Sequence, residues 1–209
     1  VGLLRSTGLL GPVSRLLHPV TDGVAIQRAD VYTLRTPSWQ LSTAQRHHPG
    51  EYGDQQHVWS ANLGGFAVFA THPAAPLAAR GALSEAPGYW VGNGRNPDAA
   101  QDGNAVLAIY AVPEKKGFME RSLVDFTHAY FPVEKFDEAE VAGRYAFGRA
   151  GDAYVALVAR ETLSWAGESR EDLVQPGRLA YWICELGSPD TDASFAAFVD
   201  RIRAHPVDF

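Results

Sequence analysis

Two runs of strand-forming residues in the second half of the chain are separated by a short turn. The runs cover residues 144–149 and 153–160, and the pair Gly151–Asp152 lies between them. Glycine and aspartate tolerate the positive φ angles that a tight turn between twisted strands requires. The sequence therefore predicts an antiparallel β-hairpin at this point, which favours a fold built from locally paired strands.

Similar runs bounded by turn residues recur along the rest of the chain. Gly64–Gly65 marks a second hairpin. We expect the apolar run 105–112 to be a central strand covered on both faces, and the long segment 77–104 to be irregular. The acidic residues 136–141 suggest a turn of helix. The other predicted strands are 29–35, 39–45, 55–63, 66–72, 125–131 and 178–186.

Helical patterns are confined to the two ends. Residues 3–17 carry leucines at mixed spacings of three and four. Residues 195–202 carry apolar side chains at i, i+3, i+4 and i+7, and Asp192 or Ser194 is a suitable N-cap. We therefore predict an all-β fold, an antiparallel β-sandwich with short terminal helices.

The domain organisation follows from this change of pattern. We expect residues 1–23 to be a helical lead-in or linker from an upstream domain, and residues 24–209 to be the β-sandwich domain with its final helix. The chain starts at Val1, without a methionine and without a signal-peptide pattern. We expect it to be the C-terminal piece of a longer polypeptide.

Charge and cysteine content exclude several classes of function. The net charge of −6 and the pI of about 5.6 argue against nucleic acid or an anionic membrane as the partner. The single cysteine, Cys184, excludes an internal disulfide, and its apolar surroundings predict a buried, inert thiol. The sequence predicts a soluble protein, leaves its compartment open with secretion and the periplasm as the candidates, and specifies no cofactor.

The segment 88–97 combines glycines with aromatic and amide side chains. Tyr89 and Trp90 can stack on the face of a sugar ring, and Asn93 and Arg95 can hydrogen-bond to its hydroxyls. A packed loop with Trp90 in the core is the structural alternative. The sequence thus predicts a sugar-binding loop, with Trp59 as a further aromatic contact.

Two histidines and a tyrosine are the candidate catalytic residues. By strand alternation His57 and Trp59 share one face, and so do His128 and Tyr130. A His–Tyr pair on one sheet face suits proton abstraction next to a carboxylate, because one group takes the proton and the other returns it to the leaving oxygen. The alternative is that His57 and His128 are hydrogen-bonded structural histidines.

Two other chemistries remain open. Glycoside hydrolysis needs a pair of carboxyl groups at a suitable separation, which the sequence alone does not define. A zinc site needs characteristic His spacings, which are absent, so we predict no metal ligands unless distant strands assemble a site. The acidic candidates are Glu51, Asp54, Asp125, Asp137 and Glu138, and the histidine candidates are His47, His48, His57, His72 and His128.

Three strings give the chain a family resemblance: Tyr32…Gln40-Leu-Ser-Thr-Ala-Gln45…Pro49-Gly50…Gln55-Gln-His-Val-Trp59, then Gly88-Tyr-Trp-Val-Gly-Asn-Gly-Arg95, and then Phe126-Thr-His-Ala-Tyr-Phe-Pro132. They resemble the C-terminal β-sheet region of heparinase II/III-like proteins, which join a helical toroid to a β-sandwich. The resemblance covers residues 27–185. It implies an upstream (α/α) toroid as partner and a polysaccharide or oligosaccharide bound between toroid and sandwich. The residues that would line that seam are His57, Asn93, Arg95, His128 and Tyr130.

From the sequence we therefore expect the β-sandwich part of a polysaccharide-active enzyme, of a uronate lyase-like or glycoside hydrolase-like type. A non-catalytic carbohydrate-binding or scaffold domain is the first alternative. A metal-dependent hydrolase with a histidine site is the second.

Overall fold

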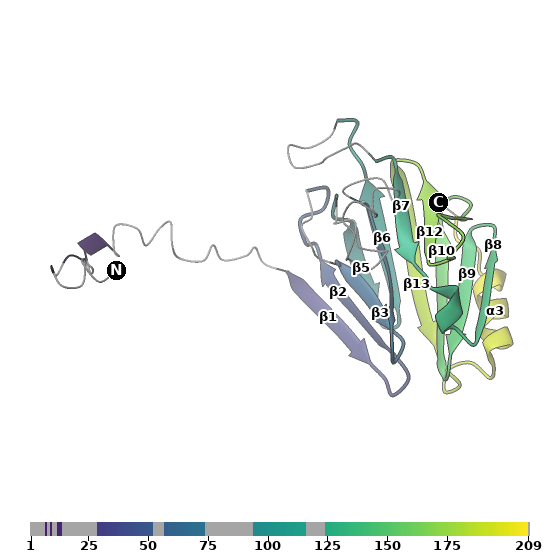
Figure 1. Ribbon diagram of the computed structural model, residues 1–209. Coiled ribbons are helices and arrows are strands. Elements are labelled where there is room, and N and C mark those ends of the chain that lie inside the picture. The colour runs from purple at the N-terminus through teal and green to yellow at the C-terminus, as the bar shows by residue number, and fades with distance from the viewer. Residues whose placement is uncertain are drawn as a thin grey trace.

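The computed structural model describes residues 7, 9, 12–13, 29–51, 57–73, 94–115 and 124–208 (Figure 1). They form two antiparallel β-sheets and one α-helix of ten residues, which confirms the predicted all-β sandwich. The elements are β1 (Asp30–Arg35), β2 (Gln40–Gln45), β3 (Trp59–Asn62), β4 (Ala67–Thr71), β5 (Asp98–Asp102), β6 (Ala105–Ala111), β7 (Phe126–Tyr130), η2 (Val133–Lys135), β8 (Glu138–Ala142), β9 (Tyr145–Ala150), β10 (Ala153–Ala159), β11 (Ser164–Trp165), β12 (Asp172–Pro176), β13 (Leu179–Gly187) and α3 (Phe195–Ala204).

Strand order differs from chain order in both sheets. The seven-stranded sheet runs β1-β2-β3-β4-β7-β12-β11, and the six-stranded sheet runs β5-β6-β13-β10-β9-β8. The local hairpins β3–β4 and β9–β10 form as the turn residues predict. The pairs β4–β7, β7–β12 and β6–β13 join strands that lie far apart in the chain. The first two of these pairs bring the residues of the candidate site together.

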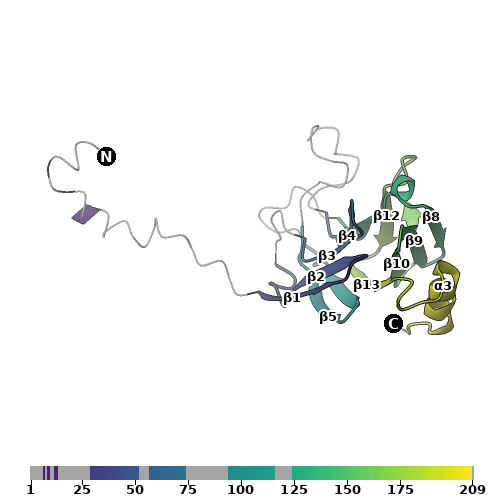
Figure 2. The ribbon, with the colours of Figure 1, turned by 90° about the horizontal axis from the view of Figure 1, so that it is seen from below.

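The main core lies between the two sheets, where alternate residues of each strand point inward. Hydrogen bonds cross this core. The indole of Trp182 donates to the Thr127 hydroxyl at 2.7 Å, and the Tyr110 hydroxyl donates to the carbonyl of Ala70 at 2.7 Å. At one end, β2 lies across β5, and the Thr43 hydroxyl donates to Gln101 at 2.7 Å (Figure 2). The buried polar groups that carry these bonds fix how the sheets are placed on one another.

Strand β10 is the centre of the second half of the molecule. All seven of its residues are buried, because one face packs in the main core and α3 covers the other (Figure 2). The helix contributes Phe198, Val199 and Ile202 to this second cluster, and Ser194 caps it by accepting a hydrogen bond from the Ala197 amide at 3.1 Å. The predicted C-terminal helix and one of its two candidate caps are thus confirmed.

The prediction of a doubly covered strand at 105–112 is wrong. Strand β6 is next to the edge strand β5, and Leu107 on its outer face is 38% exposed. The equally apolar β10 fills that role, because α3 lies over β10. The lead-in 1–23 falls almost entirely outside the described residues.

Two edge strands lie where the sequence predicted an irregular segment and a turn of helix. Strand β5 occupies the end of the segment 77–104, which was expected to be irregular. Strand β8 covers most of the acidic run in which a turn of helix was expected. Pairing with β9 explains β8, since Arg149 on β9 binds Glu138 at 2.8 Å and neutralises part of its acidic face. Tertiary pairing overrides the local pattern in both cases.

Candidate functional site

The outer face of the seven-stranded sheet carries a compact set of polar and aromatic side chains. On β4, Phe69 and Thr71 alternate with inward residues of the core, so both point outward. On β7, His128 and Tyr130 point outward in the same way, and Phe69 lies opposite Tyr130 and Thr71 opposite His128. Asp172, the first residue of β12, lies opposite Tyr130 on the other side. Three neighbouring strands thus bring these five side chains together.

A chain of hydrogen bonds runs across the three strands. His128 Nδ1 lies 3.0 Å from a carboxylate oxygen of Asp172, and His128 Nε2 lies 2.8 Å from the hydroxyl of Thr71. All three side chains are buried, with His128 at 0% exposure. An ionised carboxylate only accepts hydrogen bonds, so Nδ1 carries a proton. In the neutral imidazole, Nε2 then accepts from the Thr71 hydroxyl.

This order of acid, histidine and hydroxyl is the order found in hydrolase triads. Burial argues against that use here, because Thr71 is only 4% exposed and its hydroxyl already has a partner in His128. Both ring nitrogens of His128 are occupied as well. The Thr71–His128–Asp172 chain therefore fixes the positions of its neighbours and does not itself face a substrate.

His57 lies over this part of the sheet. Its imidazole stacks on Phe69, with ring centroids 3.8 Å apart and an angle of 20° between the planes. Phe69 also stacks on Tyr130, with centroids 5.6 Å apart. His57, Phe69 and Tyr130 therefore form a row of three rings on the outer face, which we call the ring row.

Burial keeps His57 uncharged over most of the pH range. Desolvation lowers the pKa of its imidazole from 6.5 to about 4, and the nearby His128 acts in the same direction. At neutral pH the ring is a neutral base. A histidine in this state can accept a proton without first losing one.

Two pairs of side chains were predicted to share a face of the sheet, and only one of them does. His128 and Tyr130 both point outward, as expected. Trp59 does not lie beside His57: its side chain is 1% exposed in the main core, while His57 stacks on the outer face. The reason is a bend at Val58, so that regular alternation starts only at Trp59. Trp59 packs between the sheets and is not retained as a sugar contact.

The predicted sugar-binding loop is described only at its end. Tyr89, Trp90 and Asn93 lie outside the described residues. Arg95 is described, and its guanidinium donates to the carbonyl of Gly50 at 3.1 Å, which ties it to the loop after β2. The structure thus gives Arg95 a contact within the fold and leaves the three other residues as sequence predictions.

A third histidine, His72, is buried next to the candidate site. Its Nε2 lies 2.8 Å from the carbonyl of Val124, and its own carbonyl accepts a hydrogen bond from the amide of Gly94 at 2.6 Å. Gly94 needs to be glycine, because a Cβ there would lie 2.8 Å from Cε1 of His72 and 2.9 Å from the carbonyl oxygen of Pro73. Gly94, the last glycine of the predicted sugar-binding segment, thus packs on a histidine ring.

Sequence reasoning missed Phe69, Thr71 and Asp172. Phe69 and Thr71 alternate in an apolar run, and this pattern alone predicts only a strand. Asp172 is in an acidic stretch that resembles a solvated loop. A buried His needs a partner for each nitrogen, so the prediction of two strand histidines was a reason to search for a buried carboxylate. The sequence does not show which strand supplies it.

Metal binding and membrane insertion receive no support from the described part of the chain. Its His, Cys, Asp and Glu side chains form no group of three or more that could hold an ion. None of its helices is long and apolar enough to span a bilayer.

Comparisons with known proteins add no relative. No family model, no curated protein and no solved structure matches this chain. The likeness to toroid-plus-sandwich proteins therefore stays a prediction from the sequence strings.

Proposed function

We propose that this chain is the β-sandwich part of a polysaccharide-active enzyme of the uronate lyase type. In this proposal the substrate lies along the outer face of the seven-stranded sheet, over the ring row. The observation that carries it is that both His57 and Tyr130 stack on Phe69. A neutral imidazole and a phenol packed on one buried phenylalanine supply a base and an acid close together, and His57, the most exposed of the three rings, is where the substrate reaches them.

The reaction is an elimination. His57 takes the proton from the carbon next to the uronate carboxylate, and the electron pair of that C–H bond becomes the new C=C bond. The bond from the ring to the glycosidic oxygen breaks, and Tyr130 gives its proton to that oxygen. The product is an unsaturated uronate, and no water is consumed. The low pKa of His57 favours the neutral base that the first step needs.

His128 is a positioning residue in this scheme. Its two nitrogens are held by Asp172 and Thr71, so it does not touch the substrate. Asp172 lies opposite Tyr130 in the sheet, so the same chain of hydrogen bonds holds the strand that carries the acid. This revises the sequence-based role of His128 from catalyst to support.

An upstream (α/α) toroid is the proposed second wall of the cleft. This part of the proposal rests on the three strings that resemble toroid-plus-sandwich proteins. The ring row would then line the seam between the two domains.

The test uses the full natural protein that contains this chain. Alginate, polygalacturonate and hyaluronan are supplied, and formation of the unsaturated product is followed by its ultraviolet absorbance. We expect turnover of at least one polymer, and its loss in His57→Ala and Tyr130→Phe. His205→Ala, at the end of α3 and away from this sheet, is the matched control and should stay active.

Two results would count against the proposal. Retention of the polymers without product, in the wild type and in all variants, would support the carbohydrate-binding alternative. Turnover that survives both His57→Ala and Tyr130→Phe would show that the base and acid are elsewhere.

A further inference from the structure

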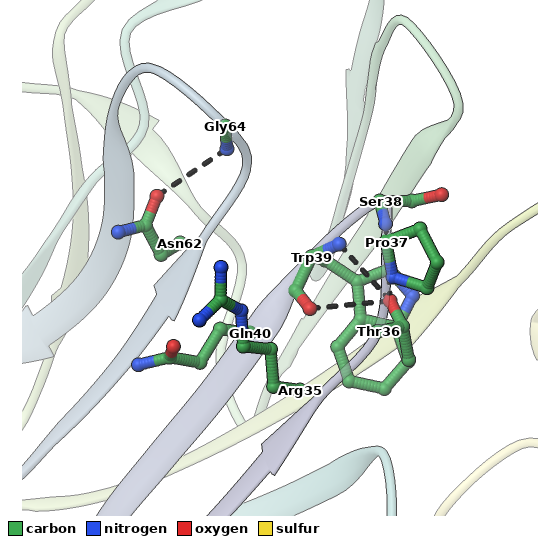
Figure 3. A pocket seen from close by; sticks show the side chains of 8 residues that line it. All are labelled: Arg35, Thr36, Pro37, Ser38, Trp39, Gln40, Asn62 and Gly64. Carbon is green, nitrogen blue, oxygen red and sulfur yellow. Dashed lines mark hydrogen bonds between the residues drawn. The ribbon is translucent and has the colours of Figure 1, made fainter.

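A second group of polar side chains lies on the same outer face, near the β1 edge. Arg35, Gln40 and Asn62 stand directly opposite one another on β1, β2 and β3. All three face away from the core, because their neighbours Leu41 and Ala61 point inward. Figure 3 shows the guanidinium and the two amides on one side of the strands. They line a pocket of about 330 Å³ between the β1–β2 and β3–β4 turns.

The three side chains keep complementary hydrogen-bonding groups available. The amide nitrogen of Gln40 donates to Ser42 at 3.2 Å, which leaves its oxygen as an acceptor. The amide oxygen of Asn62 accepts from the backbone of Gly64 at 3.3 Å, which leaves its nitrogen as a donor (Figure 3). No acidic side chain of the described residues forms an ion pair with Arg35. The pocket therefore offers a cation, a donor and an acceptor.

The floor of the pocket is fixed. The Thr36 hydroxyl accepts from the amide of Trp39 at 3.0 Å and donates to its carbonyl at 3.1 Å, which closes the β1–β2 turn (Figure 3). Trp39 is 5% exposed and anchors the turn in the core. Because the pocket lies on two anchored hairpins, its lining residues lose little conformational entropy when a ligand binds.

The geometry points to a subsite for a carboxylate-bearing sugar unit, with Arg35 on the carboxylate and Gln40 and Asn62 on neighbouring hydroxyls. This inference rests on the proposed function, since it assumes a polysaccharide on this face. Asn62 lies opposite Ala67, which is two residues from Phe69 on β4. Arg35 is thus three strands from the ring row, about 14 Å at the usual strand spacing. A substrate chain lying across the strands would reach both places.

A guanidinium explains the expected selectivity. Hydrogen bonds to a charged group are stronger than those between neutral groups, and Arg can hold a carboxylate through two parallel bonds. A neutral glucan offers only hydroxyls, so it should gain little from Arg35. The subsite therefore selects acidic polymers by their charge.

The test measures binding of alginate, polygalacturonate and hyaluronan by titration calorimetry, with dextran as the uncharged reference. We expect Arg35→Ala to weaken binding of the acidic polymer about fivefold to tenfold and to raise KM without changing kcat. Arg35→Lys should lose less, because it keeps the charge but not the paired bonds. Asn62→Ala should lose about threefold. Arg178→Ala removes an exposed arginine from the turn after β12 and should bind like the wild type.

The outcomes separate this inference from the proposed function. If Arg35→Ala binds acidic polymers like the wild type while His57→Ala loses turnover, the subsite is wrong and the lyase proposal stands. If Arg35→Ala weakens binding but no variant or wild-type protein forms product, the subsite stands and the lyase proposal fails. If no acidic polymer binds better than dextran, the subsite is overturned.

Discussion

The imidazole of His57 lies flat on the ring of Phe69, with centroids 3.8 Å apart. This contact removes water from one face of the imidazole, and burial lowers its pKa to about 4. The unfolded chain binds a proton at His57 below about pH 6.5, whereas the folded protein binds it only near pH 4. The free energy of unfolding therefore keeps its full value above pH 6.5 and decreases as the pH falls towards 4, by at most about 3 kcal/mol.

Urea unfolding near pH 7 and near pH 4.5 checks this prediction in wild type and His57→Gln. The difference in free energy of unfolding between the two pH values should be about 1–3 kcal/mol smaller in the variant, which has no ionisable group at this position. Equal pH dependence in both proteins would show that His57 titrates normally in the fold.

Replacing His128 by alanine should strongly destabilise the protein. Asp172 is 3% exposed, and the substitution leaves its carboxylate without the imidazole. Leaving a buried carboxylate without one of its hydrogen-bond partners costs about 3 kcal/mol. Thr71→Val removes one hydrogen bond and should cost about 1 kcal/mol. Chemical unfolding of the two variants, and of the double variant, measures the coupling, and equal small effects would contradict a tightly linked chain.

Gly94→Ala should destabilise the protein by about 1–3 kcal/mol, because the added methyl group meets the His72 ring and the Pro73 carbonyl oxygen at less than 3 Å. Gly65→Ala is the matched control, since a methyl group there has no atom within 4 Å. Thermal melting of both variants makes the comparison. A Gly94→Ala protein that melts like the control would show that the His72 ring moves aside at little cost.

Arg201→Ala should loosen the C-terminal helix. The guanidinium binds Asp192 at 2.8 Å and Glu185 at 2.6 Å, and it lies over the ring of Phe198 at 5.3 Å. The hydrogen bond to Asp192 is the main cause of the raised pKa of Arg201. Arg201 is 40% exposed, so we expect a loss of only about 1 kcal/mol. Denaturant unfolding measures it, with Arg178→Ala as the reference. Equal free energies of unfolding for the two variants would show that α3 is held on the sheet by apolar burial alone.

The sequence predicted the parts of the fold that depend on neighbouring residues. The β9–β10 hairpin is set by its turn, and α3 by its cap and apolar spacing, so both were predictable. Strands β5 and β8 were not, because their own residues carry no strand pattern and they exist only where β6 and β9 offer an edge. Edge strands of this kind depend on the finished sheet.

The candidate site shows the same limit. Alternation placed His128 and Tyr130 on one face, since both lie on a single strand. Thr71 and Asp172 reach His128 only because β4 and β12 flank β7, and those pairings join residues 57 and 44 positions apart. No local pattern encodes such pairings, so these partners become visible only in three dimensions.

The position of β10 has a consequence for synthesis on the ribosome. Strand β13, which pairs with β10, ends at Gly187. Helix α3, which covers the outer face of β10, ends at Ala204. Strand β6, which is synthesised much earlier, also needs β13 as its pairing partner. The first hairpins can pair as they emerge, but the centre of the six-stranded sheet forms only after β13 has left the exit tunnel. During that interval two apolar strands are exposed, and a chaperone that binds extended apolar segments has its best opportunity to engage this protein.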